Sequence, residues 1–267
     1  MTSFIAQRAR RLLAGAAILA AALTSGLSAT PLAAASPADA VRADGTPIAT
    51  TRPDVTGSDV TPADVAASNA KVRMAYEALV VMWRDEFAAI GERFAAPRLA
   101  RHRSAVPSAC GIMRPGNAAY CPAENVIYYD DVFVAGQAKA AARDLGTDGD
   151  MAAIGVIAHE MGHAVALQLG VLSRRTYDNE AVADCLAGAF ARRADADGSL
   201  EPGDVEEAFH AMSRAGDPTP VLTGDTRTDR RVLLRVARDG HGTREQRMAN
   251  FDAGLGDGAG ACLAQFR

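Results

Sequence analysis

The sequence predicts a helix-dominated α+β fold with a small β-sheet, and three observations lead to this fold class. Almost half of the 267 residues are apolar whereas only 5% are aromatic, and this composition favours a packed, mainly helical core. Several long stretches repeat apolar residues at helical spacing. By contrast, only residues 126–131 form a short run rich in the β-branched and aromatic residues that are typical of strands.

The first predicted helix covers about residues 65–91. Its apolar side chains fall on one helical face, and Gly91 could end it. The single tryptophan, Trp83, lies on this face and is expected in the core. The members of the face are Val72, Tyr76, Leu79, Val80, Trp83, Phe87 and Ile90.

The rest of the chain alternates loops and helices. Residues 97–123 have a loop-like composition and precede the strand. Three further helices are expected, at 151–169, 178–193 and 205–215. Gly170 would end the first of these and Asp204 would cap the last. Residues 252–260 are rich in glycine and are expected to form a loop.

The N-terminal part predicts export. Residues 1–35 combine a basic start, an apolar run of about 16 residues and a stretch of small residues, which together are typical of a signal peptide. The apolar run is shorter than the roughly 20 residues of a membrane span, so an uncleaved anchor is the less favoured alternative. Residues 36–63 have the composition of a disordered linker, which leaves residues 64–267 as the folded domain. We therefore expect a secreted, periplasmic or cell-surface protein.

Charge gives little indication of a nucleic-acid partner. The formal net charge is −4, and it becomes −7 if residues 1–35, which hold three arginines and no acid, are removed. Acidity of this size mainly favours solubility. A membrane is an expected partner only if the N-terminal segment stays uncleaved.

Four cysteines predict two disulfides, because an even number is typical of exported chains. Three pairings are possible. Cys110 and Cys121 enclose a short loop with proline and glycine, so we pair them, which leaves Cys185 with Cys262. Zinc ligation by cysteine is the weaker alternative, because no CxxC spacing occurs.

The sequence His159-Glu160-Met161-Gly162-His163 predicts a metal site. Residues four apart share one helical face, so both imidazoles can reach one ion. Glu160 lies close enough to accept a proton from a water at that ion. The helix is apolar nearly all round, and burying these groups unpaired would be costly. A pair of hydrogen-bonded core histidines is the alternative.

The segment from Asn179 to Asp184 can supply the third zinc ligand. Glu180 and Asp184 are four residues apart on the next predicted helix and face the same way. We expect Glu180 to bind the metal and Asp184 to accept the free ring N–H of one ligand histidine. Two solvated carboxylates are the alternative, but the flanking residues are apolar.

The order of these motifs resembles the thermolysin-like gluzincins and, more closely, the bacterial neutral zinc metallopeptidases. The resemblance covers about residues 108–266, with matching stretches at 110–111, 120–122, 126–130, 157–163, 180–188 and 241–247. It implies a zincin-like metallopeptidase domain with an HExxH active-site helix and one Zn²⁺ ion. The connection from His163 to Glu180 is shorter than usual for that family, which should change the rim of the cleft and leave the metal chemistry intact.

The same resemblance places His241 near the site, where it could stabilise an oxyanion; a structural loop histidine is an equal alternative. Tyr128 or Tyr129 could assist in the same way from the predicted strand. His102 lies between two arginines and His210 lies on a polar helix face, so we expect both at the surface.

The expected function is hydrolysis of peptide bonds in a peptide or protein substrate, with Glu160 as general base. Two other classes stay open. One is a zinc-dependent hydrolase of a non-peptide amide, which the residues do not separate from a peptidase. The other is a catalytically silent zincin-like binding module, which an intact Glu160 disfavours.

Overall fold

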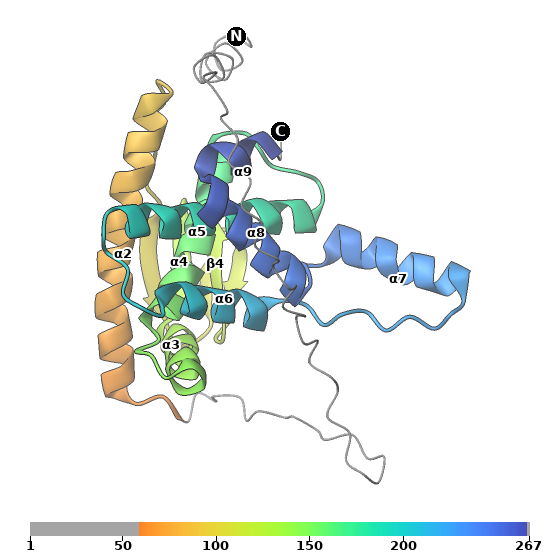
Figure 1. Cartoon of the computed structure of the whole chain (residues 1–267), viewed down its shortest axis with the longest axis horizontal. Coiled ribbons are helices and arrows are strands. Elements are labelled where there is room, and N and C mark those ends of the chain that lie inside the picture. Colours follow the sequence, from red (N-terminus) through yellow and green to blue (C-terminus); the bar gives the residue numbers. More distant parts are fainter. Residues whose placement is uncertain (1–58, 266–267) are drawn as a thin grey trace, which may run out of the picture. The chain divides into compact units, whose positions relative to one another are not determined.

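The computed structural model describes residues 59–265, except the side chains of residues 237–239 (Figure 1). The predicted signal peptide and most of the predicted linker lie outside this range. The described part is a helix-dominated fold with a small mixed sheet, which confirms the predicted α+β class. None of the described helices is long and apolar enough to cross a membrane.

Helix α2 (Pro62–Ala89) is the first described helix, and it begins within the predicted linker 36–63. The hydroxyl of Thr61 accepts from the backbone N–H of Asp64, whose carboxylate accepts from the N–H of Thr61 in return. This capping box fixes the first turn. The predicted apolar face is buried and includes Trp83, which is 1% exposed. Ile90 is an exception: it follows the last turn and is exposed.

The three-stranded sheet has the order β1-β5-β4. Strand β5 (Val126–Asp130) is the predicted strand; β1 (Arg98–His102) pairs with it in parallel and β4 (Ala118–Cys121) pairs antiparallel. Strands β2 (Val106–Ser108) and β3 (Gly111–Met113) form a separate hairpin. The prediction of a loop at 97–123 is therefore wrong. Strands of three to five residues gain their stability from distant partners, so they leave little local pattern in the sequence.

Helix α3 (Asp131–Leu145) follows β5 directly and was not predicted. Asp130 ends the strand and caps the helix, since its carboxylate accepts from the N–H groups of Val132 and Phe133. A carboxylate at that position is a usual helix start. The sequence predicted only the strand, because the apolar run before this helix has a strand-like composition.

The C-terminal half consists of helices, and two predicted details need correction. The helices are α4 (Asp150–Gln168), α5 (Thr176–Ala196), α6 (Asp204–Ala215), α7 (Thr226–Asp239), α8 (Arg244–Asp257) and α9 (Ala259–Gln265). Asp204 is the first residue of α6 and not its cap, which is Gly203. The predicted loop at 252–260 is mostly helix, in α8 and α9.

The glycines of that segment have a packing role. Helices α5 and α8 pack against each other, and a Cβ at Gly254 would overlap the backbone of Cys185 and Ala189. Glycine there permits a close helix crossing, so its helix propensity was a poor guide. Disulfide Cys185–Cys262 joins α5 to α9, and Cys110–Cys121 joins the β2–β3 segment to β4.

Helix α4 is central: it contacts α2, α3, α5, α6 and β4. Its N-terminus has no cap from a neighbouring side chain. Instead, the fully buried carboxylate of Glu207 on α6 accepts from the N–H groups of Gly149 at 2.9 Å and Met151 at 2.8 Å. A negative side chain at a helix N-terminus is also favoured by the helix dipole.

Glu207→Gln is expected to lower the free energy of unfolding by about 2 kcal/mol or more, because the amide leaves one buried N–H without an acceptor. Chemical denaturation would measure the change. Glu206→Gln, the same substitution at the exposed neighbouring position, is the control and should be close to neutral. Equal effects of the two variants would contradict a capping role.

Candidate metal centre

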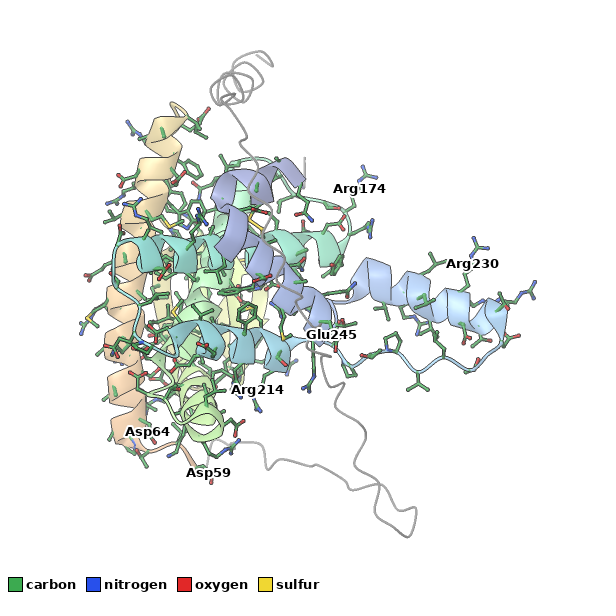
Figure 2. The ribbon with its side chains drawn as sticks, in the orientation of Figure 1. Asp59, Asp64, Arg174, Arg214, Arg230 and Glu245 are labelled. Carbon is green, nitrogen blue, oxygen red and sulfur yellow. A yellow bond between two sulfur atoms is a disulfide. The ribbon has the colours of Figure 1, made fainter. Side chains whose placement is uncertain are left out.

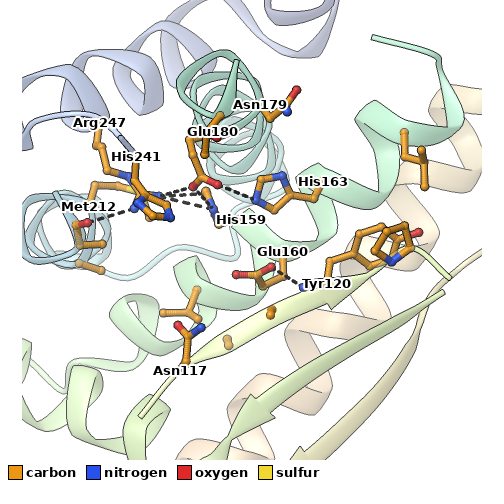
Figure 3. Close-up of a pocket in the computed structure, with 18 of the residues that line it drawn as sticks. Asn117, Tyr120, His159, Glu160, His163, Asn179, Glu180, Met212, His241 and Arg247 are labelled. Carbon is orange, nitrogen blue, oxygen red and sulfur yellow. Dashed lines mark hydrogen bonds and ion pairs between the residues drawn. The ribbon is translucent and has the colours of Figure 1, made fainter. Parts of the chain in front are cut away.

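Helices α4 and α5 bring the three predicted zinc ligands together (Figure 3). His159 and His163 share one face of α4, and Glu180 approaches from α5. The His159 Nε2 lies 3.2 Å from Glu180 Oε2, and the His163 Nε2 lies 3.5 Å from Glu180 Oε1. One ligand atom from each residue lies within 4.8 Å of the others.

This donor set fits a zinc ion. Two imidazole nitrogens and one carboxylate oxygen are typical catalytic zinc ligands, with a further position left for water or substrate. Burial lowers the pKa of His163, which favours the neutral, ligating form. Burial alone would also lower the pKa of His159, but Asp184 and Glu180 outweigh it and raise that pKa. The carboxylates of Asp184 and Glu180 thus make the position beside His159 favourable for a cation.

Asp184 orients His159, as the sequence predicts for one ligand histidine. Its Oδ1 lies 2.8 Å from His159 Nδ1, and Asp184 is fully buried. The Nε2 of His159 is thereby left to face Glu180 and is available to a metal ion. Asp184 is itself held by Arg247 of α8, whose Nε and Nη2 donate to the carboxylate at 3.0 and 2.6 Å. Arg247 also donates to the carbonyl of Ala215 at the end of α6.

Sequence reasoning gave Arg247 no role, although it lies in the matched stretch 241–247. It is 6% exposed, and a buried arginine requires anionic partners. Such a residue cannot be assigned from sequence when its partner lies 63 positions away.

Asp184→Asn is expected to weaken zinc affinity about 10- to 100-fold, the usual cost of losing a partner behind a metal-bound histidine. Competition with a chromophoric chelator would measure it. Asp195→Asn, at an exposed position of the same helix, is the matched control and should bind zinc like the parent. An unchanged affinity of Asp184→Asn would show that Asp184 does not support the metal ligand.

Glu160 faces the same pocket from α4. Its Oε2 accepts from the backbone N–H of Tyr120 at 2.8 Å, so strand β4 holds the carboxylate in place (Figure 3). Glu160 is 7% exposed. No sequence pattern indicated this contact, because it joins residues 40 positions apart.

The pocket has a volume of about 650 Å³. Polar groups gather around the two histidines, and apolar side chains line much of the remaining wall. Lining residues include Asn117, Ala118, Ala119, Tyr120, Pro122, Phe133, Val156, His159, Glu160, His163, Leu167, Leu172, Thr176, Asn179, Glu180, Ala211, Met212, Ala215, His241 and Arg247.

His241 lies at this pocket, as predicted, with a side chain that is 57% exposed. Its backbone N–H donates to Asp217 at 2.6 Å, and its ring Nδ1 lies 3.8 Å from the same carboxylate. The predicted tyrosines do not line the pocket. The hydroxyl of Tyr128 donates to Glu124, and buried Tyr129 donates to Asn69. The pocket tyrosine is Tyr120 of β4, since β4 and not β5 is the strand beside the site.

Two histidines expected at the surface are not exposed. His102 is 8% exposed, with Nδ1 3.1 Å from the carbonyl of Ser104. His210 is half-buried, with Nε2 3.0 Å from Asp144. The packing of β1 and of α3 against α6 covers them, which the polar neighbours in sequence did not reveal.

A second acidic cluster consists of Asp148, Asp150, Asp204 and Glu207. Its charges are already accounted for. Lys71 forms ion pairs with Asp148 and Asp150, and Glu207 caps α4. Burial raises the pKa of Asp204 to about 6, and the nearby acids add to the shift. Lys71 and the N–H groups at the start of α4 thus engage three of these carboxylates, which stabilises the α4 end.

The comparison with protein families also indicates zinc. The model of the family described as "Putative neutral zinc metallopeptidase" matches residues 12–266. The chain belongs to this family. Similar proteins include two from Escherichia coli, strains K12 and CFT073, each named "Uncharacterized protein YpfJ". Each is 32% identical over 197 residues, or 66% of this chain and 63% of the relative. The chain thus spans less than two thirds of these relatives. No solved structure matches it.

Proposed function

We propose that this protein is an exported zinc metallopeptidase that hydrolyses peptide bonds. His159, His163 and Glu180 would hold the zinc ion in a zincin-like domain, with α4 as the HExxH helix. The observation that carries the proposal is the position of Glu160: its carboxylate lies in the same pocket as the three ligands and is aimed by the N–H of Tyr120. The two disulfides support export, because such bonds persist in oxidising compartments.

The residues of the pocket have separate tasks. A bound zinc ion would supply a Lewis acid for the scissile carbonyl. Glu160 would accept a proton from the attacking water and deliver it to the leaving amine. Asp184, held by Arg247, would keep the imidazole of His159 in the ligating orientation. His241 at the exposed side of the pocket would donate to the oxygen that becomes negative in the transition state.

Strand β4 favours a peptide over a small amide. It is an edge strand, and the N–H of Asp130 on β5 donates to the carbonyl of Asn117. Because hydrogen-bonding residues alternate along an antiparallel strand, the backbone groups of Ala118 and Tyr120 point away from β5. They face the pocket side. The N–H of Tyr120 donates to Glu160, and the other backbone groups of the two residues are placed for an extended peptide to add to the edge. A non-peptide amide substrate would not use this edge and is the second candidate.

Cleavage of a diverse synthetic peptide library, read by mass spectrometry, tests the proposal. The zinc-loaded protein would be compared with the Glu160→Gln variant and with the metal-stripped protein. Cuts seen only with the zinc-loaded parent would establish a peptidase. A folded, zinc-replete parent that cleaves no peptide would contradict the proposal and favour the non-peptide hydrolase or the silent binding module.

A further inference from the structure

Helix α7 and the segment before it form an extension, residues 217–239, which we call the α7 arm. In Figure 1 the helix stands out from the helices α5, α6 and α8. Its N-terminal end is fixed within the arm itself: the Asp229 carboxylate accepts from the N–H groups of Thr223 and Gly224. Asp225 caps the helix by accepting from Thr228. The arm is thus an ordered structure with much of its surface free.

Exposed apolar side chains gather on the α7 arm. Ten large apolar residues are exposed in the part of the chain that the structure describes, and four of them belong to this one short arm. Val221 is 87% exposed, Leu222 51%, Leu233 46% and Leu234 60%. A concentration of this kind on a protruding element marks an interaction surface.

The helix of the arm is basic: residues 226–239 hold five arginines and two aspartates. Arg227, Arg230, Arg231 and Arg235 are all exposed, and none of the four forms an ion pair with another side chain that the structure describes (Figure 2 labels Arg230). Two acids beside them in the arm, Asp225 and Asp229, accept hydrogen bonds at the helix N-terminus. Four arginines therefore face solvent on a chain whose net charge is −4.

Charge and apolar surface occupy one face. Leu234 follows Arg231 by three positions, Arg230 by four and Arg227 by seven, and residues at these spacings are neighbours on a helix. An exposed leucine surrounded by guanidinium groups suits a boundary that is apolar inside and negative outside. The interface of an anionic lipid bilayer has this composition.

We propose that the α7 arm binds the surface of an anionic lipid membrane. The leucines and Val221 would enter the level of the acyl chains, and the arginines would contact the lipid phosphates. A second copy of the chain fits less well, because a two-fold contact would bring the same arginines against one another. The proposal does not rest on the hydrolytic function. If both hold, His241, which follows α7 and lines the pocket, would lie near the lipid surface.

Vesicle binding by the full-length protein tests the proposal. Vesicles of phosphatidylcholine and equimolar mixtures with phosphatidylglycerol would be sedimented with the parent and with three variants. The charge variant replaces Arg227, Arg230, Arg231 and Arg235 by Gln, and the apolar variant is Leu233→Ser with Leu234→Ser. The control variant replaces Arg73, Arg84, Arg93 and Arg114, exposed arginines outside the arm, by Gln. Thermal unfolding would show that all variants are folded.

The parent and the control variant are expected to bind the anionic vesicles alike. The charge variant should bind at least roughly 25-fold more weakly, since each arginine at an anionic surface contributes about a five-fold factor and at least two should engage. The apolar variant should also bind more weakly, and binding by the parent should fall with added salt. In a Leu234→Trp variant the emission should shift to the blue with anionic vesicles, because the native Trp83 is buried throughout.

Three outcomes would overturn the proposal. The parent could fail to bind anionic vesicles. The parent could bind while the charge and apolar variants bind equally well, which would locate binding in another part of the chain. Finally, the parent could form dimers that the α7 variants lose, without any vesicle binding, and this would assign the arm to a second copy.

Discussion

Glu160→Gln is expected to lower kcat/KM for peptide cleavage by about 10²- to 10⁴-fold, the usual contribution of a general acid–base. The substitution keeps the size of the side chain and an oxygen that can still accept from the N–H of Tyr120. It removes the group that accepts the proton of the attacking water. Because Glu160 is not among the three clustered ligands, zinc should stay bound.

The measurement is steady-state cleavage of the best peptide from the library, together with zinc content and the midpoint of thermal unfolding. Glu86→Gln, at an exposed position of α2, is the matched control and should cleave like the parent. Full activity of Glu160→Gln would show that Glu160 is not the general base. Loss of zinc along with activity would show instead that Glu160 helps to hold the metal.

His163→Ala is expected to reduce zinc from one ion per chain to well below one and to abolish peptide cleavage. His163 would provide one of the three ligand atoms of the proposed site, and two ligands hold zinc poorly. Its ring lies near Glu180 and edge-on to His159, and it takes no part in the Asp184–Arg247 contacts. The fold should therefore survive the substitution.

Elemental analysis after dialysis would give the zinc content. Thermal unfolding with and without zinc would give the stabilisation of the fold by zinc binding. A ligand at 100 times its Kd stabilises by about 2.7 kcal/mol, so the parent should gain stability that the variant does not. His210→Ala removes a histidine outside the pocket and should retain the zinc response. If His163→Ala kept a full zinc ion, the proposed ligand set would be wrong.

The sequence determined the parts of the site that lie within one helix turn. His159 and His163 share a face of α4 with Glu160 one position on, and Glu180 and Asp184 share a face of α5, so helical spacing alone predicts both groupings. The long helices α2, α4 and α5 could also be predicted from the sequence, because their apolar pattern repeats over many residues. No local pattern predicted helix α7 of the arm, because it lacks the repeating apolar face of a core helix and has a basic surface.

Only the tertiary structure decided which distant groups meet at those faces. The N–H of Tyr120 reaches Glu160 across 40 positions and Arg247 reaches Asp184 across 63. Short strands such as β4 form through pairing with distant partners, and Gly254 permits the close α5–α8 crossing that carries Arg247 to the site. The residue types at these positions fit several environments, so their roles follow from packing. Local spacing thus determined the proposed metal ligands, while packing decided what orients them.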